Sequence, residues 1–335
     1  MSVRQAAARL ELRTTLETLP LRTPFRIAGF TFTEIPVIVV ELRDGALRGR
    51  GEAAGVYYLD DHPAGMTRTV EACRSAIEAG LSREELRSVL PVGGARNAVD
   101  CALWEIEAKR AGVPVWKLAG LDCTIPLTTT FTLSADDPVA MADAARANRA
   151  AQALKLKLSG DLVVDAERVR QVRAARPDVW LGVDANQAFT VDSLSELLPV
   201  LVDARVLLIE QPLARGREAD LDAFASPIPL AADESLQGVA DIENLLGRFD
   251  VVNIKLDKCG GLTEALLMVE AARRYGLQVM VGNMIGSSLA MAPAFVVGQR
   301  CDVIDLDGPT FLMADRAPGV TYRDGTIWCP QEIWG

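Results

Sequence analysis

Histidine is almost missing from this sequence, and its scarcity limits the chemistry that the chain can perform. His62 is the only histidine among 335 residues. Ser-His-Asp triads and histidine-rich zinc sites need well-placed imidazoles, so neither is expected. His62 stands beside a proline in a loop-like stretch, and we interpret it as a surface residue. Any chemistry must therefore use carboxylates and lysines.

Positive charge is also in short supply. Lysine and arginine total 35 against 45 aspartates and glutamates, which gives a formal net charge of -10 at pH 7. Nucleic acids and anionic membranes recruit basic surfaces, so neither is expected as a partner.

Long apolar runs and paired cysteines are missing as well. No apolar run approaches the roughly 18 residues that a membrane helix needs. Charged side chains interrupt residues 1–13, where a secretion signal would be apolar. The six cysteines are scattered without a CxxC pair, so reduced and mostly buried thiols are expected. These absences predict a cytoplasmic protein, and a composition that is 50% hydrophobic predicts a large folded core.

The first 120 residues have a mixed α+β pattern. Strands are expected at 8–17 and 33–43, and Asp44-Gly45 is a hairpin signal after the second strand. Helical periodicity is present in three segments: 64–80, 82–90 and 95–111. We therefore expect a separate α+β domain over residues 1–120.

From about residue 125, short β-branched runs alternate with helical stretches, which is the pattern of βα units around a parallel sheet. Eight strands are expected, at residues 127–133, 153–158, 179–185, 206–212, 228–234, 251–256, 278–283 and 302–307. Eight such units close into a (β/α)8 barrel, whose active site lies at the C-terminal ends of the strands. The predicted class is therefore α/β, with the barrel over 121–316 and a hairpin pattern, YRDGTIW, in 317–335.

Five polar residues recur at the ends of successive predicted strands. They are Lys157, Asp184, Glu210, Asp233 and Lys255, and they follow one another at intervals of 22 to 27 residues. One strand, one helix and two short loops occupy about that length, so these side chains are expected to share one pocket. The alternative is that each polar residue only caps the following helix.

The three carboxylates in this series indicate a metal site. Asp184, Glu210 and Asp233 would repel one another in a partly desolvated pocket. A divalent cation relieves this repulsion, and an all-oxygen site suits Mg²⁺, with Mn²⁺ as a substitute. Pairing of the three acids with arginines is the alternative.

The lysines on the second and sixth predicted strands flank this triad. In ALKLKL, Lys155 and Lys157 alternate with leucines, so both lysines face the barrel interior if the leucines face the helices. The same alternation in VVNIKL turns Lys255 inward. Burial and a nearby cation are expected to lower the pKa of such lysines, which makes them general bases. The alternative is that they only neutralise the carboxylates.

Two lysines on opposite sides of a metal-bound carboxylate would act on the two faces of its α-carbon. One would remove the α-proton and the other would deliver a proton from the opposite face, with the cation stabilising an enolate intermediate. This arrangement is typical of a racemase or an epimerase.

The motifs together resemble the enolase superfamily, in particular the muconate-lactonizing-enzyme subgroup with its dipeptide epimerases. The resemblance rests on NAVDCALWEIEAKRAG, LKLKL, VDANQAF, IEQPL, ADES, NIKLDKCGG and DLDGP. It implies that Asp184, Glu210 and Asp233 bind Mg²⁺. It also implies that Lys157 and Lys255 are the acid/base pair. The use of lysine bases and Mg²⁺ is a general property of this superfamily.

Two further lysines receive their interpretation from the same resemblance. Lys155 is implied to tune the acid/base lysine two residues after it. Lys258 is a rival for the role of Lys255, although it lies beyond the apolar alternation of the sixth strand. The stretch VGNMIGSSLA after strand seven has no histidine, which sets the mandelate-racemase subgroup aside.

The resemblance also implies residues that bind the substrate. Asp305 and Asp307 in DLDGP match a pair that binds the α-ammonium group of a dipeptide, with helix capping or salt bridges as the alternative. Residues 1–120 resemble a capping domain, to which the segment 317–335 returns. Candidates from its loops are Arg26, Tyr57 and the neighbouring Phe25, Ile27 and Tyr58. Arg26 would pair with an acidic side chain, with a solvated surface position as the alternative.

The expected function is therefore a Mg²⁺-dependent dipeptide epimerase. It would invert the α-carbon of the C-terminal residue of an L,L-dipeptide, with L-Ala-L-Glu as a candidate, and it would form a homo-oligomer. Three relatives in the same subgroup are rival interpretations: N-acylamino acid racemase, o-succinylbenzoate synthase and muconate cycloisomerase. A non-catalytic ligand-binding barrel is the rival from another class.

Overall fold

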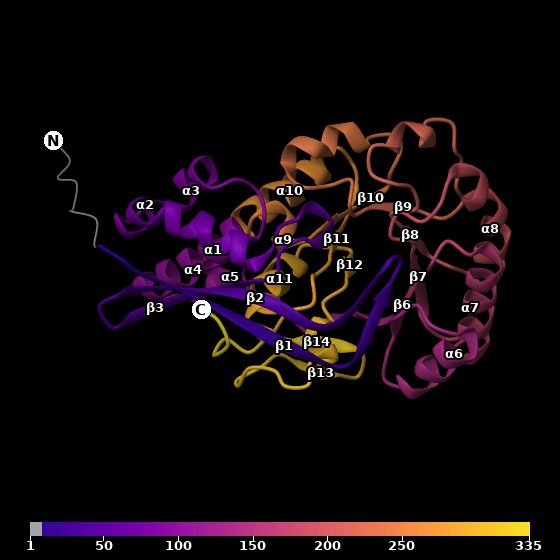
Figure 1. The fold of residues 1–335 in the computed structure, drawn as a ribbon, viewed down its shortest axis with the longest axis horizontal. Helices are drawn as coiled ribbons and strands as arrows, with labels where there is room; N and C mark the ends of the chain where they lie inside the picture. Colours follow the sequence, from indigo (N-terminus) through magenta and orange to yellow (C-terminus); the bar gives the residue numbers. More distant parts are fainter. Residues whose placement is uncertain (1–8) are drawn as a thin grey trace.

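The computed structural model describes residues 9–335. The first residue of the strand predicted at 8–17 and the start of the charged segment 1–13 lie outside the described residues. Two parts are visible in Figure 1: a cap of strands and helices on the left, and a larger barrel on the right.

The cap is built on one antiparallel sheet. Its strands β1 (Glu11–Ile27), β2 (Phe30–Asp44) and β3 (Leu47–Ala53) are adjacent in chain order. The helices are α1 (Pro63–Ala72), α2 (Arg74–Glu78), α3 (Arg83–Val89), α4 (Gly94–Ala111) and α5 (Val115–Leu118). Helix α4 packs so closely on β3 that a Cβ at Gly49 or Gly51 would lie 2.0 Å from a backbone oxygen of α4. Glycine is therefore required at both positions.

The larger part of the chain is built on a sheet of eight parallel strands, which confirms the predicted barrel. In sequence order the strands are β5 (Thr130–Leu133), β6 (Ala153–Lys157), β7 (Trp180–Asp184), β8 (Leu208–Glu210), β9 (Leu230–Ala232), β10 (Val251–Ile254), β11 (Gln278–Val281) and β12 (Val303–Ile304). Side chains join the first strand to the last, since Thr130 donates to Asp305 and the Leu306 N–H donates to Thr129 Oγ1.

Helices cover the outside of the barrel, but they do not follow every strand. They are α6 (Pro138–Ala147), α7 (Leu162–Ala175), α8 (Val191–Asp203), α9 (Leu256–Cys259), α10 (Leu262–Arg274) and α11 (Ser288–Gly298). The segments after β8 and β9 are short 3-10 turns, η2 (Glu218–Leu221) and η3 (Val239–Leu245), instead of the predicted helices. Gly216 precedes η2 in the sequence, and Pro227 follows it.

Strand β1 is much longer than its sequence pattern predicted. It continues through two prolines, Pro20 and Pro24, which an edge strand tolerates because one side of its backbone needs no partner. The pairing register with β2 shifts between Pro20 and Phe25. Figure 1 shows that the β1–β2 hairpin reaches from the cap across the barrel. This reach brings cap side chains over the ends of the barrel strands.

The end of the chain returns toward the cap. Strands β13 (Thr321–Arg323) and β14 (Thr326–Trp328) form the predicted hairpin, which pairs with the short strand β4 (Leu127–Thr128) before the barrel. Beyond it, the Trp334 indole donates to the Arg50 carbonyl of β3 at 2.9 Å. The division into domains at residues 120 and 316 stays a prediction.

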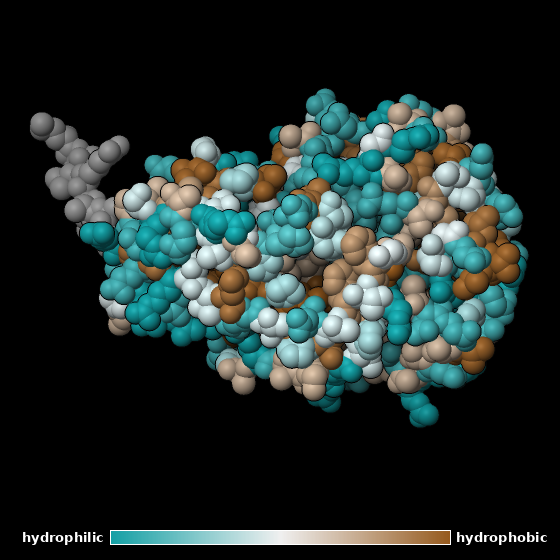
Figure 2. Space-filling view, in the orientation of Figure 1, coloured by the Kyte–Doolittle hydropathy of each residue, from teal (hydrophilic) through white to brown (hydrophobic). Residues whose placement is uncertain are grey.

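The core and the surface agree with the expected partition of side chains. A small apolar cluster lies inside the barrel, toward the N-terminal ends of its strands. Its buried members are Leu208, Ala231, Val251 and Met280. Figure 2 shows a mainly hydrophilic face on which hydrophobic patches are small and separate. No helix among residues 9–335 is long and apolar enough to cross a bilayer.

Candidate active site

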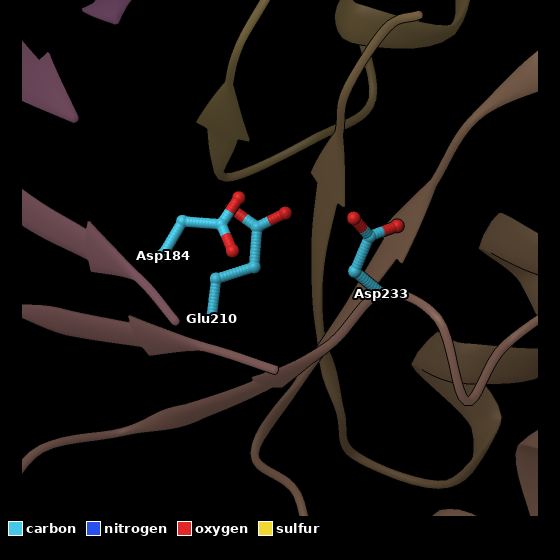
Figure 3. A group of neighbouring side chains, drawn as sticks. All are labelled: Asp184, Glu210 and Asp233. Atoms are coloured by element: carbon cyan, nitrogen blue, oxygen red, sulfur yellow. The ribbon is translucent and has the colours of Figure 1, made fainter. Parts of the chain in front are cut away.

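Three buried carboxylates meet where three adjacent barrel strands end. Asp184 ends β7, Glu210 ends β8, and Asp233 directly follows β9. Their side chains are at most 1% exposed. One oxygen from each carboxylate lies within 4.8 Å of the others, and the three groups converge from neighbouring strands (Figure 3). The sequence spacing predicted this convergence.

Two lysines flank the three carboxylates from either side. Lys157 ends β6 and its Nζ donates to Asp184 at 2.5 Å. Lys255 follows β10 and its Nζ donates to Asp233 at 2.5 Å. Both lysines are less than 10% exposed and line the same cavity. The strand alternation therefore placed both amines inside the barrel correctly.

The pKa values of two inward lysines, Lys155 and Lys255, are raised. Burial lowers the pKa of Lys255, but the charges of Asp233 and Glu210 outweigh it and hold the pKa well above its usual value. Lys155 has the same balance, with Asp305 and Glu210 opposing burial. Each of these two ammonium groups has a carboxylate as a direct partner, so burial alone does not lower its pKa, and the expected effect of a nearby metal cation stays a prediction.

Carboxyl groups outnumber ammonium groups in the buried cluster at the barrel mouth. The ammonium groups are those of Lys155, Lys157, Lys255 and Lys258, and the carboxyl groups are those of Asp184, Glu210, Asp233, Glu234, Asp305 and Asp307. Burial and Asp184 raise the pKa of Glu210 to about 7, while burial and Asp233 raise that of Glu234 to about 8. These raised pKa values reflect a shortage of positive charge beside the clustered acids, and the donor set of the triad is entirely oxygen. The residues therefore fit a magnesium ion.

Lys258 lies beside the cluster but has a different environment from Lys255. Its Nζ donates to Asp233 Oδ1 at 2.6 Å, to the Asp233 carbonyl and to the Asn253 carbonyl. It is 1% exposed and does not line the cavity. Its three donors are thus used within the protein, so it holds Asp233 in place, a role that the sequence did not reveal. Burial raises the pKa of Asp233, but Lys255 and Lys258 outweigh it and lower the pKa.

The loops after β7 and β8, which follow Asp184 and Glu210, contain residues with uncommon backbone conformations. Asn186, Gln187 and Gln211 are non-glycine residues with φ of 43°, 69° and 34°. Such conformations cost about 1 kcal/mol or more and persist where several contacts fix them. Gln211 Oε1 accepts the backbone N–H groups of Asp233 and Ser235 at 2.9 and 3.1 Å, so it ties β8 to β9.

The DLDGP motif places two further carboxylates at the barrel mouth, and both line the cavity. Asp305 pairs with Lys155 and accepts from Thr130. Asp307 is 3% exposed and accepts the Thr132 N–H at 2.6 Å. Among residues 9–335, no lysine or arginine forms an ion pair with Asp307. Burial and Asp305 raise the pKa of Asp307 to about 6, as expected for a buried acid without a cation.

A cavity of about 260 Å³ separates the barrel mouth from the cap. Among the candidates from the cap loops, Phe25, Ile27, Tyr57 and Tyr58 line it. Arg26 does not: its guanidinium is half exposed and pairs with Asp136 at 3.1 Å outside the cavity. His62 is 60% exposed, as predicted, although it also contributes to the rim.

Five polar residues that line the cavity were not among the sequence candidates: Asp61, Thr132, Asn186, Glu234 and Asn283. Glu234 follows Asp233 directly, and its Oε1 accepts from Asn186 Nδ2 at 3.3 Å. Asn283 Nδ2 donates to the Asp305 carbonyl, next to the ammonium-binding candidates. Glu234 stands inside the ADES motif and Asn186 inside VDANQAF, so position within these motifs was the available signal.

Both parts of the chain match sequence families. Residues 9–120 match the mandelate racemase / muconate lactonizing enzyme N-terminal domain, and residues 139–333 match the enolase C-terminal domain-like family. The chain belongs to the enolase superfamily. This confirms the resemblance that the strand-end motifs indicated, and it agrees with the cap-and-barrel architecture.

Relatives within the superfamily include epimerases and racemases. The L-Ala-D/L-Glu epimerase of Escherichia coli (strain K12) is 37% identical over 313 residues, which cover 93% of this chain and 97% of the relative. The N-acetyl-D-glutamate racemase of Pseudoalteromonas sp is 38% identical over 302 residues, covering 89% and 95% of the two chains. Isomerase is therefore the enzyme class that these relatives share.

Solved structures of superfamily members show the same fold. A member from Agrobacterium tumefaciens with homology to dipeptide epimerases, with bound sodium and L-Ala-L-Glu, has a TM-score of 0.93 and 38% identity. The match covers 97% of this chain and 100% of that one. A dipeptide epimerase from Methylococcus capsulatus with Mg and L-Arg-D-Lys has a TM-score of 0.89 and 30% identity, covering 95% and 96%.

Proposed function

We propose that this isomerase is a dipeptide epimerase, which inverts the α-carbon of the C-terminal residue of an L,L-dipeptide. The observation that carries the proposal is the placement of Lys157 and Lys255 on opposite sides of three buried carboxylates, in one cavity with the unpaired Asp307. Relatives named as dipeptide epimerases support the same reaction.

Asp184, Glu210 and Asp233 would hold Mg²⁺, which the charge excess and the oxygen donors favour. The cation would supply electrostatic stabilisation of a substrate carboxylate whose charge increases during the reaction. The same binding would draw the carboxylates away from their lysines, so the raised pKa of Lys255 would fall toward neutrality. Lys258 would keep Asp233 oriented throughout.

The two lysines would exchange protons with the substrate from opposite faces. A neutral amine on one side takes the α-proton and becomes an ammonium, while the electron pair of the broken C–H bond enters the carboxylate as an enolate. The ammonium of the other lysine then donates a proton to the α-carbon on the opposite face. The net result is inversion without a change in composition. Lys155 would hold Asp305 and balance its charge.

The substrate's α-ammonium group would pair with Asp307. A buried carboxylate that has no cation is costly, and a charge-assisted hydrogen bond from the substrate would remove this cost. An N-acylamino acid racemase is the second candidate function, because a racemase of N-acetyl-D-glutamate is 38% identical to this chain. Such a substrate has no ammonium group and would leave Asp307 unpaired. The substrates of an o-succinylbenzoate synthase or a muconate cycloisomerase would leave it unpaired too.

Deuterium exchange tests the proposal directly. The protein is incubated with Mg²⁺ in D₂O and a set of L,L-dipeptides, and the products are examined by mass spectrometry. We expect one deuterium at the α-carbon of the C-terminal residue, together with its inversion. Lys157→Ala and Lys255→Ala should each abolish inversion, while Lys117→Ala, which changes an exposed lysine of α5, should retain it.

Two outcomes would contradict the proposal. One is inversion that continues at the normal rate in Lys157→Ala or Lys255→Ala, since each lysine serves one face. The other is exchange of N-acylated amino acids but of no dipeptide, which would favour the racemase. Cytoplasmic location and a homo-oligomeric state stay predictions.

A further inference from the structure

Much of the cavity wall contributed by the cap and by the neighbouring barrel loops is apolar, although Tyr57, Tyr58, Asp61 and His62 also line it. Six of its side chains come from the β1–β2 hairpin and from the loops after β11 and β12: Phe25, Ile27, Phe32, Ile35, Ile285 and Phe311. Phe25 packs edge-on against Phe311 with ring centroids 4.9 Å apart, and Phe32 packs against Tyr57 at 5.4 Å. These contacts fix the wall as a continuous hydrophobic surface.

The cavity offers no spare cation to an acidic ligand group. No arginine among the described residues lines it, because Arg26 pairs with Asp136 on the outside. Its lysines all have carboxylate partners at the triad or at Asp305. His62 at the rim pairs with Asp60 at 2.9 Å. A second carboxylate on the substrate would therefore lose water without gaining a partner, which is costly.

The proposed reaction leaves one direction for the side chain of the epimerised residue. Its carboxylate lies at the acidic triad, its α-hydrogen faces Lys157 or Lys255, and its nitrogen leads toward Asp307. The end of the barrel at which its strands begin is filled by the cluster that contains Leu208 and Met280. The remaining substituent of the α-carbon must therefore point out of the barrel, against the cap.

We infer that the epimerised residue has an apolar side chain, such as that of leucine or phenylalanine, which packs on this wall. The inference rests on the proposed function, and it differs from the expectation that Arg26 selects an acidic side chain such as glutamate. Burial of apolar surface supplies the selectivity, and the missing cation disfavours the acid.

A basic side chain fits the cavity less well than an apolar one. Asp61 and Glu234 are the acids near this wall: Asp61 Oδ2 accepts the Gly94 N–H at 2.7 Å at the start of α4, and Glu234 Oε1 accepts from Asn186 Nδ2 at 3.3 Å. This contact uses Asp61 to satisfy a helix N-terminus, where a carboxylate is stabilising. Asp61 is therefore already engaged by the cap.

The first experiment compares dipeptides that differ only in the second side chain. The rate of α-deuteration in D₂O with Mg²⁺ is measured for L-Ala-L-Leu, L-Ala-L-Phe, L-Ala-L-Gln, L-Ala-L-Glu and L-Ala-L-Lys. We expect kcat/KM for the Leu and Phe dipeptides to exceed that for L-Ala-L-Glu by roughly a hundredfold, with Gln between them. A preference for Glu or Lys would overturn the inference and leave the proposed function intact. Exchange with no dipeptide would overturn the function itself.

The second experiment moves a charge into the wall. Phe32→Arg should lower kcat/KM for L-Ala-L-Leu and raise it for L-Ala-L-Glu, so that their ratio changes by about tenfold or more. Leu16→Arg is the matched control, because Leu16 lies on β1, is 54% exposed and does not line the cavity. Thermal unfolding shows whether each variant is folded. An unchanged ratio in folded Phe32→Arg would place the substrate side chain elsewhere and overturn the inference.

Discussion

Buried acids in this site differ in the partners that each one has. Asp233 receives hydrogen bonds from two lysines, and its pKa falls, whereas Asp307 receives one backbone N–H and has a pKa of about 6. The protein thus keeps one acid ionised by its own charges and leaves the other to be ionised by a ligand. This difference predicts a pH effect on substrate binding.

Asp307 should make dipeptide recognition weaken in acid. Because its pKa is raised to about 6, the carboxyl is neutral below that pH and attracts an ammonium group only above it. We expect kcat/KM for a dipeptide, divided by that for the matching N-acetyl amino acid, to fall as the pH decreases through about 6. In Asp307→Asn the ratio should be low and independent of pH. A ratio that does not change between pH 5 and 8 in the unmodified protein would contradict the assignment.

The direction of side chains near the strand ends could be predicted from the sequence, because side chains in a strand alternate between its two faces with a fixed period of two. That rule turned Lys155 and Lys157 inward and their neighbouring leucines outward, as the structure shows. Loops have no such period. The direction of Arg26 depends on Asp136, which lies 110 residues later in the chain, and no local pattern reveals that pairing.

At the scale of elements, the single-turn helix α9 connects three parts of the site. Asp257 Oδ1 accepts the N–H groups of Ala54 and Gly55 in the cap at 2.9 and 3.0 Å. The next residue, Lys258, holds Asp233 after β9. Helix α9 thus couples the position of a carboxylate in the triad to the position of the cap.

Lys258→Met should weaken metal binding more than it weakens proton transfer. Without the ammonium, Asp233 loses one of its two lysine partners and becomes free to turn, so the affinity of the triad for Mg²⁺ should fall roughly tenfold or more. Titration calorimetry with Mg²⁺ measures the affinity, and kcat at saturating Mg²⁺ should recover in large part. Complete loss of kcat at saturating Mg²⁺ in a folded variant would instead make Lys258 a catalytic residue.

The sequence predicted the elements of the barrel better than their connections. Apolar β-branched runs located all eight strands, since burial on both faces imposes this composition. The short turns η2 and η3 after β8 and β9 were expected to be helices, because the spacing between strands gives the number of intervening residues but not their backbone conformation. The full length of β1 was also missed: a strand was predicted at 8–17, whereas β1 continues to Ile27.

For the molecule as a whole, the excess of acids at the barrel mouth predicts stabilisation by magnesium. A ligand that binds only the folded state stabilises it by about 2.7 kcal/mol at a concentration about 100 times its Kd. We therefore expect the Tm to rise by several degrees on titration with Mg²⁺ and to return to its starting value with EDTA. Na⁺ at equal ionic strength is the control. A Tm that responds equally to both salts would contradict a specific site.

The cap and the barrel are joined by contacts between segments that are remote in the chain. Arg50 of β3 donates to the Ile333 carbonyl 283 residues later, and the Arg316 guanidinium donates to Glu52, the buried acid that also accepts from Ser287. Whole-molecule contacts of this kind were not predictable from local patterns, whereas the family motifs indicated the presence of both parts.

This tethering has a consequence for biosynthesis. The cap precedes the barrel in the sequence, yet Ile333 and Trp334, which contact its third strand, follow the barrel. During synthesis, the contacts of β3 with Ile333 and Trp334 therefore form only after the roughly two hundred residues of the barrel have been made.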